Sequence, residues 1–201
     1  MENQVLLRGQ LLALPQFSHE NHNKRFFRFT LEVPRLSGAV DLLPVVTEET
    51  MLNSLDLSAG GMLTVRGQIR SHNLRTDGVR HLLIFVFARS IICEDGDPIN
   101  DVILEGPLCR EPVYRRTPLG REICDVMLAV QRGYKRADYL PCILWGRTAM
   151  EASNCHIRDI VRISGRLQSR IYTKLTEDGP QERTAYEISA LTAEFPEPME
   201  D

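Results

Sequence analysis

The fold is decided by a stretch that occurs twice, as Asn-Gln-Val-Leu-Leu-Arg-Gly-Gln-Leu at residues 3–11 and as Asn-Asp-Val-Ile-Leu-Glu-Gly-Pro-Leu at residues 100–108. Further segments keep this spacing of 97 residues, with one residue of slippage in the last: 29–35 with 126–132, 41–46 with 138–143, and 63–71 with 161–169. Two copies of about 95 residues indicate a duplicated domain, because a solenoid needs at least three shorter units.

The junction between the copies is Glu94-Asp-Gly-Asp-Pro98, which has turn-forming residues and little apolar content. We therefore expect one domain at residues 1–95, a second at 98–195, and a short acidic tail at 196–201. The net charge of −3 argues against a nonspecific polycation. It leaves room for a local basic patch, since 14 basic side chains lie among residues 100–195.

The second copy contains short segments rich in β-branched and aromatic residues, mostly with alternating polarity: 102–104, 124–130, 139–145, 161–172 and 186–191. Residues 148–154 suit a short helix, and residues 47–55 are its counterpart. Five strands with a helix after the third is the order of the OB-fold. The sequence thus predicts an all-β protein with short helices, built as two tandem OB-fold five-stranded barrels. Gly106 and Gly165 fall in mid-strand, where a barrel bends or bulges.

Several classes of function find no support in the sequence. It has no apolar run near the ~18 residues of a membrane span and no signal peptide, so we expect a cytoplasmic, nucleoid-associated protein without membrane contact. The five scattered cysteines are expected to be reduced and mostly packed, without a metal. Because motifs for catalysis or cofactor binding are missing, we expect a protein that is not an enzyme and needs no cofactor.

A family resemblance emerges from five segments of the second copy in register: 100–112, Arg-Thr-Pro-Leu-Gly at 116–120, Leu-Ala-Val-Gln-Arg at 128–132, Trp-Gly-Arg-Thr-Ala at 145–149, and Gly-Arg-Leu-Gln-Ser-Arg at 165–170. Their order and spacing resemble the bacterial single-stranded DNA-binding protein family. The resemblance covers residues 100–190 and reaches 3–92 only through the repeat. It implies that bases stack on exposed aromatic side chains at Tyr134, Tyr139, Trp145 and Tyr172.

The alternation of the strands agrees with this implication. Tyr139 and Trp145 share one face of their strand, and Tyr172 shares a mainly polar face with Arg170. Basic side chains near them are candidates for neutralising phosphates: Arg115, Arg116, Arg132, Lys135, Arg136, Arg147, Arg158, Arg166, Arg170 and Lys174. Two alternatives stay open, namely that Trp145 belongs to the core and that the arginines only pair with surface carboxylates.

The first copy lacks these aromatic residues. The four aromatic positions, carried back through the repeat, hold Ser37, Leu42, Glu48 and Leu74. Phe27 and Phe29 are expected in the core. We therefore expect the first domain to keep the barrel without the stacking platform, and either to serve assembly and protein contacts or to bind DNA weakly through another face.

The main hypothesis is binding of single-stranded DNA with little sequence preference, in replication, recombination or repair. The alternatives are a primosome-like tandem OB module that binds protein, and a binder of single-stranded RNA. Family members with two OB domains form dimers, so the resemblance implies a homodimer with the first strands at interfaces. Replication or repair proteins are candidate partners, although the tail lacks the terminal apolar residue and the flexible spacer of the family.

Overall fold

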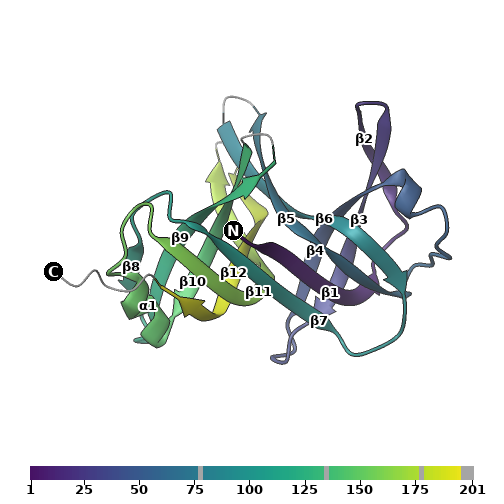
Figure 1. Cartoon of the computed structure of the whole chain (residues 1–201). Helices are drawn as coiled ribbons and strands as arrows, with labels where there is room; N and C mark the ends of the chain where they lie inside the picture. The colour runs from purple at the N-terminus through teal and green to yellow at the C-terminus, as the bar shows by residue number, and fades with distance from the viewer. Residues whose placement is uncertain (77–78, 134–135, 177–178, 196–201) are drawn as a thin grey trace.

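The computed structural model describes residues 1–76, 79–133, 136–176 and 179–195, and strands dominate it (Figure 1). The first half contains β1 (Asn3–Leu11), β2 (Gln16–Asn21), β3 (Lys24–Pro34), β4 (Val40–Glu48), the 3-10 turn η1 (Glu49–Met51), β5 (Met62–Thr76) and β6 (Val79–Cys93). The second half contains β7 (Ile99–Pro107), β8 (Val113–Arg116), β9 (Glu122–Arg132), β10 (Arg136–Trp145), α1 (Gly146–Ala152), β11 (Ile160–Thr176) and β12 (Gly179–Glu194).

Each half of the described chain closes into a barrel of five strands. Domain one runs β1–β5–β6–β4–β3 and returns to β1, where Leu11 pairs with Leu31. Domain two runs β7–β11–β12–β10–β9 and closes through the bridge between Leu108 and Leu128. The prediction of two tandem OB-fold barrels is confirmed. The short strands β2 and β8, which extend the sheet beyond β3 and β9, were not predicted.

Alternating burial along the strands builds the core. In β7, for example, Val102 and Leu104 are buried whereas Asp101 is exposed. The buried side chains of both barrels belong to one continuous apolar cluster. Because each strand then turns its other face outward, the residues of that outer face are free to bind a ligand.

The helices differ between the two domains. In domain two α1 starts two residues earlier than predicted and buries Ala149 and Ala152. In domain one the predicted helix is reduced to the turn η1, because β4 continues through Glu48. At the positions of the two buried alanines, the repeat places the bulkier Leu52 and Leu55, which are only partly buried against the core.

Two glycines mark bulges where neighbouring strands approach most closely. The register shifts at Gly165 against β12 and at Gly67 against β6. A Cβ atom on Gly165 would lie 2.2 Å from the carbonyl oxygen of Ser189, and one on Gly67 would lie 2.3 Å from that of Phe87. Since such distances are not tolerated, both positions require glycine. The expected bulge at Gly165 is therefore present.

The two domains are joined by antiparallel pairing of β1 with β7 (Figure 1). Val5 pairs with Val102, its own equivalent in the repeat, so the joint has local two-fold symmetry. Strand β1 lies between β5 and β7, and β7 lies between β1 and β11. The first strands thus form an interface within one chain. Both edges of each are occupied, which corrects the expectation that these edges contact a second copy.

A buried carboxylate of domain one holds domain two in place. Asp41 is fully buried and accepts hydrogen bonds from the backbone N–H of Ser169 (2.7 Å) and from Nε of Arg35 (2.8 Å). The hydroxyl of Ser169 also donates to Asp41 at 3.2 Å. This carboxylate raises the pKa of Arg35 through its hydrogen bond.

The equivalent carboxylate of domain two holds domain one. Asp138 is fully buried and accepts hydrogen bonds from the backbone N–H of Ser71 (2.7 Å), from Nε of Arg132 (3.0 Å) and from Arg70 (3.1 Å). The hydroxyl of Ser71 accepts a bond from the N–H of Tyr139 at 2.7 Å. Each domain therefore supplies the acceptor for a backbone donor of the other.

Replacing Gly165 by alanine should destabilise the protein by about 1–3 kcal/mol, because the added methyl group overlaps the backbone of β12. The matched control is Gly133→Ala, where an added Cβ meets nothing within 4 Å. We expect urea unfolding to separate the two variants clearly. Equal unfolding midpoints for both would contradict the close approach.

Asp41→Ala and Asp138→Ala should each cost stability near the lower end of the about 3–5 kcal/mol seen when a buried ion pair is broken, since the arginine partners are partly exposed. Glu49→Ala serves as a control because its pair with Arg25 is at the surface, with side-chain exposures of 35% and 51%. That control should cost less than about 1 kcal/mol. Thermal unfolding of the full chain measures all three, and an equal loss for Glu49→Ala would refute the role of the buried pairs.

Candidate nucleic-acid interface

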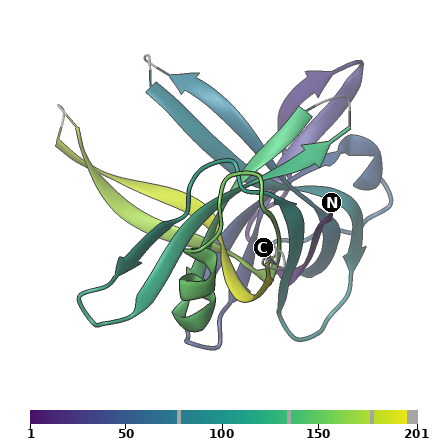
Figure 2. The same cartoon turned by 60° about the vertical axis from the view of Figure 1, so that its left-hand side comes forward.

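A groove of about 640 Å³ lies on the outer face of domain two, between the β8–β9 hairpin and strands β11 and β12. Figure 2 shows the β8–β9 hairpin and the β11–β12 hairpin extending from the barrel. Side chains of mixed character line the groove: Arg110, Val113, Arg115, Ile123, Asp125, Val126, Pro141, Cys142, Ile143, Trp145, Gln168, Arg170, Ala185, Tyr186 and Glu187. The lining combines apolar and aromatic side chains with three arginines, and its two carboxylates, Asp125 and Glu187, lie beside Arg115 and Arg170. Such a lining suits a ligand that is both flat and negatively charged.

Trp145 stands at the end of β10 with 37% of its surface exposed. Its Nε1 donates a hydrogen bond to Oγ of Ser189 on β12 at 3.1 Å. The indole is therefore held in position, while part of it lines the groove. The sequence left open whether Trp145 belongs to the core. The structure places it at the surface.

Three arginines border the groove. Nε of Arg115 donates to Asp125 at 2.8 Å, and this hydrogen bond raises the pKa of the guanidinium. Arg170 lies 3.8 Å from the carboxylate of Glu187. Arg110, which sequence reasoning missed, makes no ion pair with any described side chain. The sequence could have indicated Arg110, since it falls within the family-like segment 100–112.

Two of the predicted tyrosines, Tyr139 and Tyr172, do not line this groove. Tyr139 is 44% exposed on the outer face of β10, and its backbone bond to Ser71 puts it at the boundary with domain one. Tyr172 is 37% exposed on β11, with the Arg170 guanidinium 5.8 Å from its ring centre. That contact links Tyr172 to the groove edge. Tyr134 and Lys135 lie outside the described residues. Tyr186, which was not predicted, lines the groove, and burial raises its pKa.

The remaining predicted cations are distributed over several regions. Arg116 pairs with Glu122, and Arg147 pairs with Glu151 one helical turn away. Others are spread along β11 and its preceding loop: Arg158, Arg166 and Lys174. Arg132 and Arg136 line a second pocket, at the domain boundary. The predicted set therefore forms no single patch.

The equivalent positions of domain one hold no aromatic residue, as expected from the repeat. Leu42 and Leu74 are about as exposed as the tyrosines they replace, at 42% and 43%. Glu48 accepts a hydrogen bond from Nζ of Lys24 at 2.9 Å, and this bond lowers the pKa of its carboxyl group. Phe29 is buried as predicted, whereas Phe27 is only half-buried.

The described residues hold no group of three or more His, Cys, Asp or Glu side chains that fits a metal ion. In the same part of the chain, no helix is long and apolar enough to cross a membrane. The cysteines are free thiols, of which Cys93 is exposed. Burial raises the pKa of the Cys124 thiol to about 11.

Comparison with known proteins adds to this geometry. The profile of the Single-strand binding protein family matches residues 99–196. Single-stranded DNA-binding protein B of Bacillus subtilis is 37% identical over 106 residues, which cover 49% of this chain and 91% of that protein. Single-stranded DNA-binding protein 2 of Listeria innocua is 32% identical over 108 residues, or 50% of this chain and 65% of that protein.

One solved structure extends the likeness over both domains. The wild-type single-stranded DNA binding protein from Thermus aquaticus superposes with a TM-score of 0.80 at 25% identity, covering 100% of this chain and 95% of that one. The sequence likeness lies in domain two, and the likeness in fold includes domain one. By the match to the Bacillus protein, and in agreement with the groove around Trp145, this chain belongs to the single-strand binding protein family.

Proposed function

We propose that the chain binds single-stranded DNA with little sequence preference through the groove of domain two. The observation that carries this proposal is Trp145, whose indole is anchored to Ser189 and lines a groove edged by arginines. The relatives of this chain are named as single-stranded DNA-binding proteins, which favours this ligand over a protein partner.

The proposed mechanism combines stacking with phosphate neutralisation. Every base has a flat π face, so a ring such as Trp145 accepts any base, and one stacked base contributes about 1–3 kcal/mol. Arg110 is free to contact a phosphate. Arg115 and Arg170 pair with carboxylates at an exposed edge, where an ion pair is worth little, so exchange of the carboxylate for a phosphate costs little.

The wider biological assignments follow from the family and are part of the same proposal. They comprise a role in replication, recombination or repair, contact with replication or repair proteins, association with the nucleoid, and assembly as a homodimer. Within the chain, we assign residues 98–195 as the principal DNA-binding domain and residues 1–95 as the domain that joins it at the β1–β7 pairing. The function is one of binding, without a catalytic step.

Titration with oligo-dT should quench the fluorescence of Trp145, which is the single tryptophan of the sequence. Because phosphate contacts release counterions, the affinity should fall with salt, with a slope of log K against log salt of about −0.7 for each phosphate contacted. The measurement is a fluorescence titration at two salt concentrations. Unchanged fluorescence up to micromolar oligo-dT would overturn the proposal, and tighter binding of the matching RNA would favour the RNA alternative.

Trp145→Leu should weaken binding of labelled oligo-dT roughly 5- to 150-fold, as measured by fluorescence anisotropy, since one stacked base is lost. The matched control is Tyr114→Leu. Tyr114 is an exposed aromatic residue on β8 that does not line the groove, although both of its neighbours do. Equal effects of the two substitutions would show that the groove is not the site of stacking.

A further inference from the structure

Domain one carries aromatic rings on its outer face, next to the position that corresponds to Trp145. That position is Glu48 on β4. Phe26 on β3 pairs directly opposite Glu48, and Phe87 on β6 pairs with Val46, two residues before it. The two phenylalanine rings lie on either side of β4, with their centres 6.1 Å apart. The rings of domain one thus stand on the strands that flank the central one.

The rings of Phe26 and Phe87 are partly open to solvent and contact each other at a tilt of 45°. Phe26 and Phe87 are both half-buried, although neither belongs to the buried core of the barrel. His19 on β2 lies parallel to Phe26, with ring centres 4.8 Å apart and an angle of 10° between the planes. The Phe87 ring contacts Phe26 at a tilt of 45°, and we call the three rings of His19, Phe26 and Phe87 the phenylalanine stack.

Two arginines cover the end of this stack. The guanidinium of Arg89 lies 5.2 Å from the ring centre of Phe87, and that of Arg70 lies 5.9 Å from it. Both donate hydrogen bonds to Oε1 of Gln68, at 3.4 Å and 2.6 Å respectively. An arginine over an aromatic ring is a common element of single-strand binding surfaces, because it contacts a base and a phosphate together.

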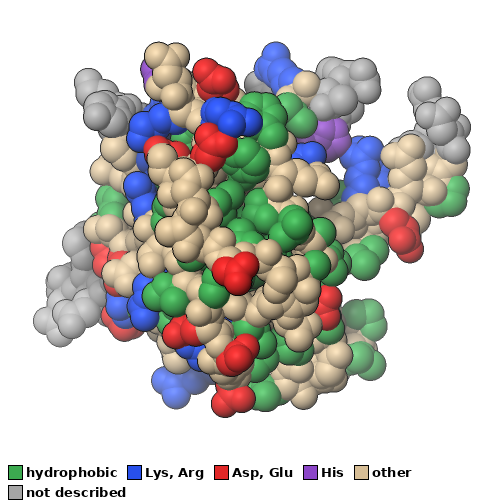
Figure 3. Space-filling model, turned by 90° about the vertical axis from the view of Figure 1, so that its right-hand side faces the viewer, with side chains coloured by type: hydrophobic (Ala, Val, Ile, Leu, Met, Phe, Trp, Pro, Cys, Tyr) green, Lys and Arg blue, Asp and Glu red, His purple; other side chains and the backbone are tan. Residues whose placement is uncertain are grey.

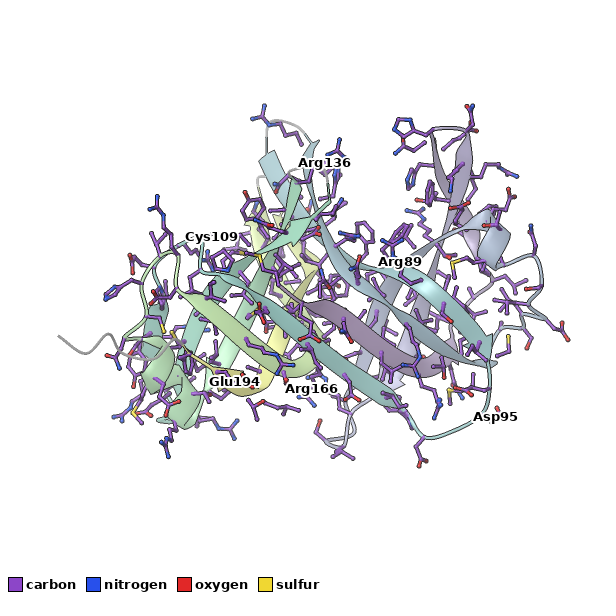
Figure 4. The ribbon with its side chains drawn as sticks, in the orientation of Figure 1. Arg89, Asp95, Cys109, Arg136, Arg166 and Glu194 are labelled. Carbon is purple, nitrogen blue, oxygen red and sulfur yellow. The ribbon has the colours of Figure 1, made fainter. Side chains whose placement is uncertain are left out.

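The same arginines belong to a pocket of about 500 Å³ that both domains build. Domain one contributes Arg70, Arg89 and His22, and domain two contributes Arg132, Gly133 and Arg136. Figure 4 shows Arg89 on β6 and Arg136 at the start of β10, on the upper side of the molecule. In Figure 3, which looks onto the side of domain one, Lys and Arg side chains lie along the upper part of this face, with Asp and Glu side chains among them.

Positive charge in this pocket exceeds negative charge. Asp138 is the carboxylate that binds Arg70 and Arg132, and it is fully buried beneath them. Neither Arg89 nor Arg136 makes an ion pair with a described side chain. Burial lowers the pKa of Arg70, and the charges of Arg132 and Arg89 lower it further. An anion that enters the pocket would relieve this repulsion.

The acidic residues beside the phenylalanine stack are already neutralised. Glu48 pairs with Lys24 at 2.9 Å, and Glu49 pairs with Arg25 at 2.6 Å. Glu48, which stands where domain two has Trp145, therefore does not leave an uncompensated charge against a phosphate. The surface as a whole combines π faces with surplus cations.

We propose that the phenylalanine stack and the arginine pocket form a second subsite for single-stranded DNA, in which a phosphate binds between Arg89 and Arg136 and a base packs against the rings of Phe26 and Phe87. This inference rests on the function proposed above and extends it across the domain boundary. It identifies the other face through which domain one binds DNA. An acidic protein segment would also match the cations, but it would leave the rings without a role.

The test uses the full chain with two lengths of oligo-dT. One OB barrel contacts roughly 4–16 nucleotides, so an oligomer of about 8 fits the groove of domain two and one of about 30 spans both domains. Phe87→Leu should weaken binding of the long oligomer fivefold or more and leave the short one unchanged. Quenching of Trp145 by the short oligomer should persist, because the tryptophan lies in the other domain.

Arg89→Gln combined with Arg136→Gln should lower the salt slope for the long oligomer by about 0.7, because the one phosphate held between the two arginines is no longer contacted. Two controls match these changes. Phe17→Leu alters a phenylalanine of domain one that packs on Phe27 outside the stack, and Arg121→Gln removes an exposed cation at the far hairpin of domain two. Neither control should change the ratio of long-oligomer to short-oligomer affinity.

Photocrosslinking of wild-type protein to oligo-dT should yield peptides that contain Phe26 or Phe87, and this measurement does not depend on how the variants fold. Wild-type affinity of Phe87→Leu for the long oligomer, together with crosslinks confined to domain two, would overturn the second subsite while the groove of domain two stands. Competition by polyglutamate as strong as that by oligo-dT would overturn it in favour of an acidic protein partner. Failure of the short oligomer to quench Trp145 would instead count against the proposed function itself.

Discussion

The antiparallel pairing of β1 with β7 is the constraint on which the rest of the structure depends. It aligns Val5 with Val102, so one strand of the repeat meets its own copy as it would in an isologous homodimer. With this register set, Ser71 of one barrel reaches Asp138 of the other, and Ser169 reaches Asp41. Each buried carboxylate is then satisfied by donors from both barrels, which opposes separation of the domains.

The two-fold relation also shows where the copies have diverged. Asp41 and Asp138 hold equivalent places, and so do their partners Arg35 and Arg132, but Arg70 beside Asp138 has no arginine as its counterpart. The pocket residues Arg70 and Arg136 correspond through the repeat to Gln168 and Ala39. Gln168 donates to Glu187, and both residues line the groove around Trp145. The surplus cations therefore lie at the boundary around Asp138 and not at the symmetric one around Asp41. The two barrels belong to one chain, so a substitution in one barrel does not change the equivalent residue of the other.

Much of this architecture follows from local sequence rules. The repeat and its alternation predict both barrels, and Gly165 predicts the bulge. The outward face of Trp145 was implied by the family resemblance, because the alternation alone left a core position open. The joint between domains is not predictable in this way, since the partners of Asp138 come from positions more than 60 residues away. The short strands β2 and β8 were missed because they are polar and exposed, so no burial pattern marks them.

The aromatic residues of domain one show why comparison by position has a limit. Transfer of Trp145 through the repeat arrives at Glu48 and indicates a lost platform, which is true of that position alone. Stacking requires an exposed π face and places no demand on which strand supplies it. The pairing register puts Phe26 opposite Glu48 and Phe87 beside Val46, so the same outer face keeps its rings on neighbouring strands. A face of a sheet, and not a position in the sequence, is thus the unit that a duplicated barrel retains.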